Sequence, residues 1–348
     1  MYPDLDRRQM VVAGMAILAL QGCSRPEEPL NAPASQAAAN SQPASVREIT
    51  NLTGDLYRFR NDDHYSVFLV TSAGIILADP ISVDASTWLK GEIARRFNVP
   101  VRYVLYSHHH WDHASGAAVF NETAELVGHE NMPRAIQSTA TALAGNTAAQ
   151  DQNGNGRIER DEARGVMSTG FNVIDRNSDG SLTAAEVMAD VLPPEVTYTS
   201  RRTIVLGGKS VELVHPGPNH SNDSSVLLFP AERVVFGVDF VAVKRVPGGL
   251  LGDGSLDNWV DALKTVEALE FDTVAPGHGA VGTKADFSAY RQYVEDLRNG
   301  VSAGIAAGRT IEELQASDML SSHSSLDNYA AGRKQNIEQA YRLLKERG

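Results

Sequence analysis

From residue 47 onward, short apolar runs alternate with turns and with longer segments of helical periodicity. Runs that alternate apolar with polar residues, or that are rich in β-branched and aromatic residues, predict strands. The strand runs are 55–60, 64–71, 73–79, 101–107, 124–130, 196–208, 209–216, 224–230, 232–240 and 271–279. Helical spacing predicts helices over 82–97, 131–145 and 256–269, and further helices after Gly282. The pattern therefore predicts a domain that mixes strands with helices.

The first 23 residues have the pattern of an export signal. Arg7 and Arg8 precede Met10–Leu20, an uncharged and largely apolar segment that is too short to span a bilayer as a mature helix. We therefore expect a signal peptide over residues 1–23 and no permanent transmembrane anchor. The paired arginines look like a twin-arginine (Tat) export signal.

Cys23 is the single cysteine of the chain. Residues 20–23 resemble a lipobox, which implies cleavage before Cys23, lipid attachment to its sulfur, and a periplasmic lipoprotein tethered to a membrane of the cell envelope. The alternative is an ordinary signal peptide with an incidental cysteine. With one cysteine, the chain can form no internal disulfide and has no spare thiol to bind a metal. The Pro-, Ala- and Ser-rich residues 24–46 predict a disordered tether.

Four potential metal ligands fall within six residues, directly after the strand run 101–107. If the chain stays extended there, His108 and His110 point the same way, because side chains alternate along a strand. Asp112 and His113 follow, where the chain turns, and can address a second point nearby. The pattern offers two adjacent metal sites, for which imidazole and carboxylate suit zinc best, with iron or manganese as alternatives. A His-rich surface loop that binds nothing is the less favoured interpretation.

This segment, His-x-His-x-Asp-His at a strand end, resembles the signature of the metallo-β-lactamase superfamily. The resemblance implies an α+β fold, the four-layer αββα sandwich, formed by residues 47–137 and 195–348. It also implies two ligand sets and a bridging carboxylate: His108, His110 and His220 for the first ion, Asp112, His113 and His278 for the second, and Asp239 between them. Two zinc ions held in this way would share a hydroxide nucleophile, and Asp112 would orient it or move a proton.

Two residues outside these ligand sets also bear on the site. Asp79 ends a strand run and matches an acidic residue that the superfamily uses to orient a ligand imidazole from outside the coordination sphere. Its alternative role is to start a turn before Pro80. His64 precedes a strand and could reach the mouth of the cleft, but we expect it to be a solvated loop residue.

Residues 138–194 interrupt the resemblance with two stretches that resemble EF-hand calcium loops. Oxygen-bearing side chains at alternate positions wrap an ion, a glycine makes the sharp turn, and a final Glu supplies two oxygens. The expected calcium ligands are Asp151, Asn153, Asn155, Arg157 and Glu162 in the first loop, and Asp175, Asn177, Asp179, Ser181 and Glu186 in the second. Arg157 and Ser181 would contribute backbone carbonyls. We predict that these residues form a small helical insert that binds two calcium ions. The calcium would make the insert rigid, and the insert would form one wall of the active-site cleft.

The charge and the bridging residue limit the function. A formal net charge of −12 argues against nucleic acid as a partner and favours a small-molecule substrate. Asp239 favours a hydrolase of esters, lactones or thioesters, and Lys244 and Arg245 are candidates to bind a substrate carboxylate or are solvated loop cations. Three alternatives stay open: a β-lactamase of the envelope, a mononuclear iron enzyme of the sulfur-dioxygenase kind, and a calcium-dependent binding protein with an idle metal site.

Overall fold

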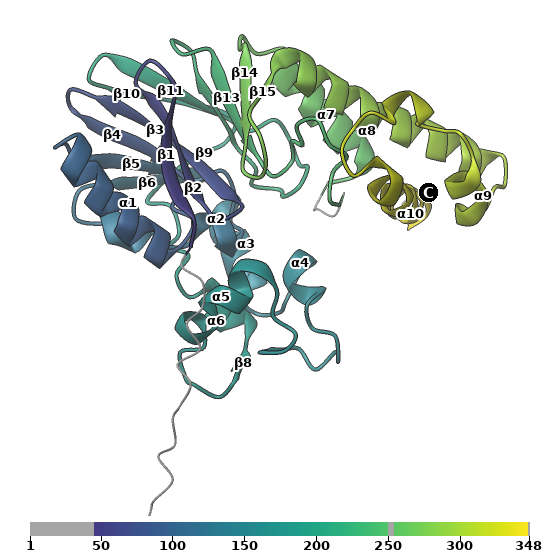
Figure 1. Ribbon diagram of the computed structural model, residues 1–348, viewed down its shortest axis with the longest axis horizontal. Helices are drawn as coiled ribbons and strands as arrows, with labels where there is room; N and C mark the ends of the chain where they lie inside the picture. Colours follow the sequence, from purple (N-terminus) through teal and green to yellow (C-terminus); the bar gives the residue numbers. More distant parts are fainter. Residues whose placement is uncertain (1–44, 250–253, 347–348) are drawn as a thin grey trace, which may run out of the picture. The chain divides into compact units, whose positions relative to one another are not determined.

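Two β-sheets lie face to face and carry helices on their outer faces (Figure 1). The computed structural model describes residues 45–249 and 254–346. The expected signal peptide, the lipidation site Cys23 and nearly all of the expected tether lie outside the described residues. Within the described ranges, no helix is long and apolar enough to cross a bilayer.

The first sheet has the strand order β1-β2-β3-β4-β5-β6-β9. Its strands are β1 (Arg47–Thr53), β2 (Leu56–Asn61), β3 (His64–Thr71), β4 (Gly74–Ala78), β5 (Val101–Leu105), β6 (Glu125–His129) and β9 (Val196–Tyr198). Strands β1 to β4 form an antiparallel meander, and the pairs from β4 to β9 are parallel. Parallel pairing requires a crossover, and the helix that connects β4 with β5 supplies the first one.

The second sheet has the order β10-β11-β12-β13-β14-β15. Its strands are β10 (Arg201–Leu206), β11 (Lys209–Val214), β12 (Val226–Phe229), β13 (Val234–Val238), β14 (Thr273–Pro276) and β15 (Gly282–Thr283). Only the β13–β14 pair of this sheet is parallel. The carboxyl ends of β13 and β14 therefore lie at the same edge of the sheet.

Apart from three short helices between α3 and β9, the helices fall into two groups along the chain. Those that follow strands of the first sheet are α1 (Val83–Arg96), α2 (Trp111–Ala114), the 3₁₀ helix η1 (Ala117–Phe120) and α3 (Met132–Thr139). Those that follow strands of the second sheet are α7 (Leu256–Glu267), α8 (Lys284–Ala306), α9 (Ile311–Ala316), the 3₁₀ helix η2 (Ser321–His323) and α10 (Tyr329–Glu346). The first group covers the outer face of the first sheet, and α7 and α8 cover that of the second, whereas α10 packs on α8 and α9 packs on α10.

Alternation along the strands builds three apolar layers. In β4, Ile75 and Leu77 pack towards Leu89 of α1, whereas Ile76 points to the opposite face and into the layer between the sheets. In β13, Phe236 enters that same middle layer, and its neighbour Val235 packs towards the helices of the second group. Because both faces of each central strand are buried, the strands read as continuous apolar runs. The four-layer αββα sandwich expected from the sequence is confirmed.

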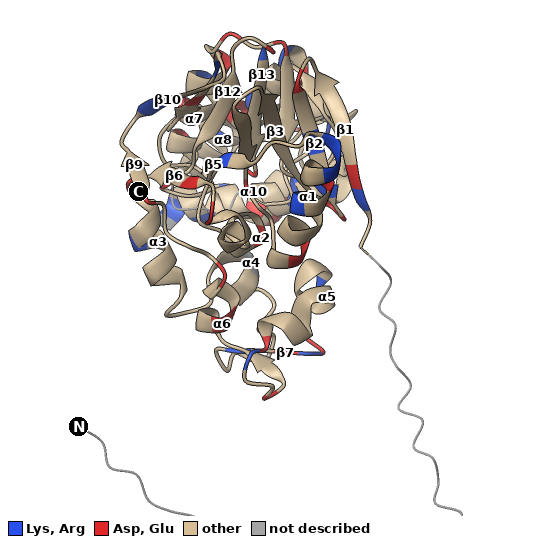
Figure 2. Ribbon diagram, turned by 90° about the vertical axis from the view of Figure 1, so that its left-hand side faces the viewer, with Lys and Arg blue, Asp and Glu red and all other residues tan. Residues whose placement is uncertain are grey.

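Residues between α3 and β9 form a small substructure with its own core. It contains α4 (Gly145–Ala148), β7 (Ile158–Glu159), α5 (Gly165–Ile174), β8 (Ser181–Leu182) and α6 (Ala184–Met188). We call it the insert. Its buried core comprises Ile158, Ala163, Met167, Phe171, Leu182 and Val187. Strands β7 and β8 pair antiparallel, and Figure 2 shows acidic and basic positions together in the loops beside β7.

The insert is fastened to the scaffold next to the His-rich motif. The backbone N–H of Gly116 donates to the carbonyl of Asp190 at 3.1 Å, and Ser115 forms an isolated β-bridge with Val191. Trp111, between two of the expected metal ligands, packs against both the insert core and the core under α1. Asp190 and Val191, where the chain leaves the insert, thus contact the turn that carries the His-rich motif.

Two sequence-predicted elements have different bounds in the structure. The run 196–208 is two strands, β9 and β10, because the chain bends at 199–200 and passes from one sheet to the other. The helix expected over 131–145 ends at Thr139. Just beyond it, the hydroxyl of Thr141 donates to the carbonyl of Ser138 at 2.6 Å, a local bond of the kind that competes with helix continuation.

Candidate metal centre

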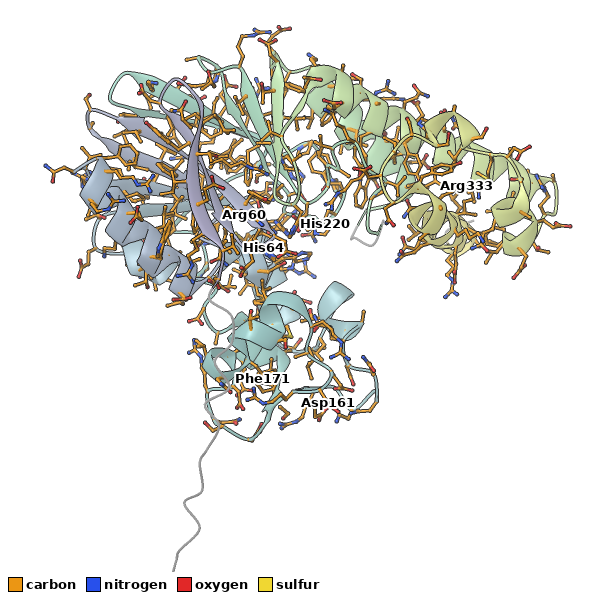
Figure 3. The ribbon with its side chains drawn as sticks, viewed as in Figure 1. Arg60, His64, Asp161, Phe171, His220 and Arg333 are labelled. Atoms are coloured by element: carbon orange, nitrogen blue, oxygen red, sulfur yellow. The ribbon has the colours of Figure 1, made fainter. Side chains whose placement is uncertain are left out.

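Strand ends place the His-rich motif and its partners at one edge of the sandwich. His108 and His110 follow β5, and His110 is the extended residue before α2. Asp239 follows β13 directly, and His278 lies just after β14. Each of these side chains lies at the end of a strand, as the sequence predicted. The topology of the two sheets brings those strand ends to a common edge. Figure 3 shows His64 and His220 on the side of the sandwich that faces the insert.

Three histidines and one carboxylate converge in a first cluster. Its members are His108, His110, His220 and Asp239, whose ligand atoms all lie within 4.8 Å of one another. Nε2 of His220 is 3.0 Å from Nδ1 of His110. Oδ2 of Asp239 lies 3.7 Å from Nε2 of His108 and 3.6 Å from Nε2 of His220. This donor set is one that binds zinc, iron or manganese.

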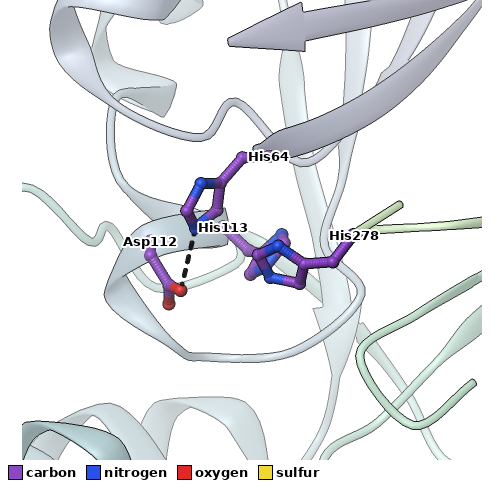
Figure 4. Close-up of side chains that lie close together, drawn as sticks. All are labelled: His64, Asp112, His113 and His278. Atoms are coloured by element: carbon purple, nitrogen blue, oxygen red, sulfur yellow. Dashed lines mark hydrogen bonds and ion pairs between the residues drawn. The ribbon is translucent and has the colours of Figure 1, made fainter. Parts of the chain in front are cut away.

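A second cluster lies beside the first and contains His64, Asp112, His113 and His278 (Figure 4). Nε2 of His113 is 3.3 Å from Nε2 of His278, and Oδ2 of Asp112 is 3.2 Å from Nε2 of His64. Imidazole nitrogens that face each other this closely suit a shared cation better than a core of ordinary hydrogen bonds.

Asp239 contacts both clusters with different oxygens. Its Oδ1 lies 3.1 Å from Nε2 of His113 and 3.4 Å from Nε2 of His278, whereas Oδ2 is the atom turned towards the first cluster. Val238 has a φ of 31°, a strained value for a β-branched residue, and this turn directs the following carboxylate into the site. A side chain at Gly277 would come within 2.9 Å of Oδ1, so the close approach requires glycine.

The histidines of the two clusters are oriented by contacts outside the clusters. Ser107 Oγ is 2.9 Å from Nδ1 of His108, and Nδ1 of His278 donates to the carbonyl of Asp63 at 2.9 Å. Asp79 accepts from the backbone N–H of Ser107 through Oδ1 at 2.8 Å and places Oδ2 at 3.8 Å from Nδ1 of His113. Asp79 therefore lies where an orienting carboxylate is expected.

Several buried polar atoms of this centre have no hydrogen-bond partner among the described residues. They are Nε2 of His108, Nδ1 of His113, Oδ2 of Asp79 and Oδ1 of Asp239. Buried polar groups without partners are costly, and an ion is one way of satisfying them. The inward-facing Nε2 of His108 and Oδ1 of Asp239 fit a bound divalent ion directly.

Burial and charge set the protonation of the centre. Burial lowers the pKa of His110 to about 3 and that of His108 well below its ordinary value, so both rings are neutral and can donate electron pairs. Burial also acts to lower the pKa of His113, but the negative charge of Asp239 outweighs it and raises the pKa to about 9. Burial likewise acts against protonation of His64, yet bonds to Asp112 and Asp63 raise its pKa to about 10. The second cluster therefore favours a positive charge.

His64 corrects an expectation from the sequence. It is the first residue of β3, only 4 % exposed, and it belongs to the second cluster rather than to a solvated loop. The hairpin between β2 and β3 pairs Asn61 with His64, and this register brings the ring to the site edge. The sequence does indicate a tight turn at Asp62–Asp63 between two strand runs. It does not indicate at which edge of the sheet this hairpin ends, because that depends on the order of the strands.

Other buried or half-buried histidines lie outside the clusters. Nδ1 of His109 lies 2.9 Å from Oδ1 of Asp223, so His109 points away from its two ligand neighbours, as strand alternation requires. His215 stacks on His129 with ring centroids 3.9 Å apart and donates through Nδ1 to a backbone carbonyl at 2.7 Å. These rings serve the fold around the centre.

A cavity of about 1410 Å³ opens above both clusters. The insert contributes part of its wall through Leu143, Arg164, Val166 and Met188. Arg245 also lines the cavity, and its Nη2 lies 3.5 Å from the carbonyl of His278. Lys244 does not line it: the residue has a φ of 58°, its side chain is 65 % exposed, and Nζ is 3.9 Å from Asp286 on the outer surface. Of the two candidate cations, Arg245 alone is placed to meet a substrate.

The two acidic loops of the insert wrap around their own backbone amides. In the first, Asp151 accepts from the N–H groups of Gly154, Asn155 and Gly156, and Glu162 accepts from those of Gln152 and Asn153. In the second, Asp175 accepts from Asp179 and Gly180, Asn177 accepts from Asp179, and Glu186 accepts from Thr183.

The loops are joined to each other. Ile158 pairs with Leu182 across β7 and β8, and these residues occupy the same position in each loop. The guanidinium of Arg157 donates to Asp179 at 2.9 Å and to Ser181 at 2.7 Å. Helix α5 lies between the loops, as the short spacing requires. The ten expected calcium-binding residues thus lie in two paired loops of similar conformation.

Comparisons with known proteins agree with this architecture. A sequence model described as the metallo-beta-lactamase superfamily matches residues 83–278. Among solved structures, a metallo-beta-lactamase from Pontibacter korlensis superimposes with a TM-score of 0.51 and 18% identity, covering 72% of this chain and 100% of that one. At this identity the likeness shows the fold alone.

Two curated relatives match in part. The 2,4-dinitroanisole O-demethylase subunit alpha from Nocardioides sp. (strain JS1661) is 24% identical over 191 residues, which is 55% of this chain and 44% of the relative. The linear primary-alkylsulfatase from Pseudomonas sp. (strain ATCC 19151) is 24% identical over 217 residues, which is 59% of this chain and 39% of the relative. The chain thus spans less than half the length of each of these relatives.

Proposed function

The chain belongs to the metallo-beta-lactamase superfamily, and from that membership we propose that it is a hydrolase that uses two metal ions to cleave an ester, lactone or thioester. The observation that carries the proposal is the orientation of Asp239, which turns Oδ1 to one histidine cluster and Oδ2 to the other. A carboxylate placed in this way suits two adjacent cations better than one.

Each group of residues then has a task. His108, His110 and His220 would hold the first ion and Asp112, His113 and His278 the second, with Asp239 shared. A pair of divalent ions, zinc first and iron or manganese as alternatives, would lower the pKa of a shared water towards neutrality and supply a hydroxide nucleophile. Asp112 lines the cavity, where its carboxylate can orient the attacking water and accept a proton.

Arg245 indicates the kind of substrate. Its guanidinium lines the cavity next to the carbonyl of His278, and its buried Nε has no hydrogen-bond partner among the described residues. Guanidinium groups bind carboxylate and sulfate in a two-point geometry. We therefore infer a small substrate that carries an anionic group, held near the second cluster.

A sulfate ester is the second candidate substrate. One of the curated relatives is named a linear primary-alkylsulfatase, and an alkyl sulfate carries the anionic group that Arg245 would bind. The same cavity would also suit a β-lactam, whose carboxylate makes it an anionic substrate. A mononuclear iron enzyme would need only one of the two clusters, and a binding protein would need neither.

Elemental analysis and turnover on one purified sample test these proposals together. We expect two zinc ions per chain, and hydrolysis of a homoserine lactone or an acyl thioester. Hydrolysis of a linear alkyl sulfate instead would favour the second candidate substrate. Asp239→Asn should lose bound zinc and turnover, whereas Asp272→Asn, which alters an exposed surface ion pair, should keep both. A single iron per chain, turnover of nitrocefin alone, or no transition metal would each refute the leading proposal and favour the corresponding alternative.

We also propose that the insert binds two calcium ions that stabilise it. The support is the pairing of two loops whose first Asp and last Glu already accept several backbone N–H groups. Each calcium ion that binds only the folded insert adds stability by mass action, about 2.7 kcal/mol per site at a free concentration of 100 times Kd. Chelation should lower the melting temperature, and an unchanged melting temperature together with unchanged activity would contradict the proposal.

Our proposal for the location in the cell rests on residues outside the described part of the chain. We propose export through the twin-arginine route and lipid attachment at Cys23 in the cell envelope, without nucleic acid as a partner. Metabolic labelling with a radioactive fatty acid tests the anchor. Label in the wild type that disappears in Cys23→Ala would support it, and labelling of both proteins or of neither would refute it.

A further inference from the structure

His64 has the surroundings of a metal ligand. Its ring is buried beside those of His278 and His113, with centroids 4.5 Å and 5.4 Å away. The backbone fixes this position, because His64 forms an isolated β-bridge with His278 and the N–H of Tyr65 donates to the carbonyl of Gly277 at 2.8 Å. The backbone that carries the ring is therefore held at the edge of the cluster by contacts between the two sheets.

The two ring nitrogens of His64 face different partners. Nδ1 lies 3.0 Å from Oδ1 of Asp63, a carboxylate that is itself exposed to solvent. A proton on Nδ1 leaves the electron pair of Nε2 pointing inward, towards Asp112. Histidines that bind metals usually donate their second ring N–H to a carboxylate or a carbonyl in this manner. His278 shows the same arrangement, with its Nδ1 donating to the carbonyl of Asp63.

We propose that His64 is an additional ligand of the second ion, through Nε2. The inference rests on the proposed function, since it assumes that both clusters hold metal. With His64, the second ion would have three imidazoles, as the first one has, together with Asp112 and a share of Asp239. Without His64, the second ion would have only two imidazoles, and it would be bound more weakly than the first.

The alternative role for His64 is to position Asp112 by a hydrogen bond. His64→Gln separates the two roles, because a glutamine amide places an N–H donor near the position of Nε2 but is a poor ligand for a divalent transition metal. A positioning role would be rescued by the amide, whereas a ligand role would not. His323→Gln is the matched control: its Nε2 also bonds a carboxylate, Asp296 at 2.8 Å, at a place remote from the centre in the C-terminal helices.

The experiment is a cobalt titration of the three proteins, monitored by absorption spectroscopy. The number of cobalt ions that each protein retains is then measured after dialysis. Wild type and His323→Gln should each retain two cobalt ions with the same spectrum. His64→Gln should retain the first ion and lose the absorption bands of the second. It should bind the second ion more than about 100 times more weakly, because loss of an outer contact alone costs about 10- to 100-fold. Two tightly bound ions and an unchanged spectrum in His64→Gln would overturn the inference. A wild type that binds fewer than two ions would refute the proposed function instead.

A measurement on the wild type removes any dependence on how the variant folds. Nitrogen-15 NMR of histidine-labelled protein with and without zinc reports each ring separately. We expect the Nε2 resonance of His64 to shift on zinc binding as those of His113 and His278 do, and the Nδ1 resonance to remain that of a protonated nitrogen. An Nε2 resonance of His64 that does not move while the others do would also overturn the inference.

Discussion

Phe171 is the side chain through which the insert can be loosened without altering the metal centre. It is 1 % exposed, and it lies in a core of only six buried residues. Truncating a buried Phe to Ala costs about 3 to 5 kcal/mol. The guanidinium of Arg160 lies 4.3 Å from the ring centre, and its loss adds ~0.5 kcal/mol. We therefore expect Phe171→Ala to destabilise the insert by about 4 kcal/mol.

A loss of this size changes how often the insert opens. About 4 kcal/mol corresponds to a factor of nearly 10³ in an opening equilibrium. Amide hydrogen exchange in α5, β7 and β8 should accelerate by that factor, up to the limit set by the insert's own stability, while exchange in β13 should stay unchanged. Each bound calcium ion should offset about 2.7 kcal/mol of the loss when free calcium is 100 times Kd. Hydrogen exchange with mass spectrometry, with and without calcium, measures all of these effects.

The control lies on the same helix. Val173 is 65 % exposed, and Val173→Ala should change the stability by no more than about 0.5 kcal/mol. Because the insert forms part of the cavity wall, Phe171→Ala should also raise KM while both transition-metal ions are retained. Equal exchange rates in the two variants would refute the assignment of an independent insert core. Loss of zinc from Phe171→Ala would refute the separation of the insert from the metal centre.

Three further perturbations have different targets. Arg245→Ala should raise KM for anionic substrates at least tenfold, whereas Lys244→Ala, outside the cavity, should leave it unchanged; equal KM values in steady-state kinetics would contradict this. Gly277→Ala should displace the carboxylate of Asp239 and reduce zinc content, whereas Gly91→Ala, with open space around its helix position, should not; two zinc ions in both by elemental analysis would exclude the steric argument. Burial lowers the pKa of His215, so its contribution to stability is complete above about pH 6.5 and is lost as the pH falls; the melting temperature should therefore fall less steeply between about pH 7.5 and 5.5 in His215→Asn than in wild type, and parallel pH profiles would count against it.

Local patterns were sufficient for some of these features. The spacing of His108 and His110 along an extended segment placed both rings on one side, and the structure brings them together with His220. Asp239 and His278 were assigned through the resemblance to the superfamily, and the parallel pairing of β13 with β14 explains why both reach the same edge. Each of these assignments depended on a strand end, which a single sequence indicates well.

Other features depended on contacts between distant segments. His64 could not be assigned, because its place follows from the register of a hairpin and from the bridge between that hairpin and His278. The division of residues 196–208 into two strands depends on the docking of two sheets, which leaves no mark in a continuous apolar run. Lys244 and Arg245 are neighbours in the chain, and the positive φ of Lys244 separates their side chains.

The bond between Asp63 and His278 joins residues 215 positions apart and connects the hairpin of one sheet to a strand end of the other. Forming such a contact costs the entropy of closing a long loop, so we expect the centre to be assembled late, after both sheets have docked. A partly folded chain therefore holds at most fragments of the donor set, such as the motif after β5. Metal uptake should then follow folding rather than guide it, and the rate at which the centre becomes competent for metal should report completion of the whole sandwich.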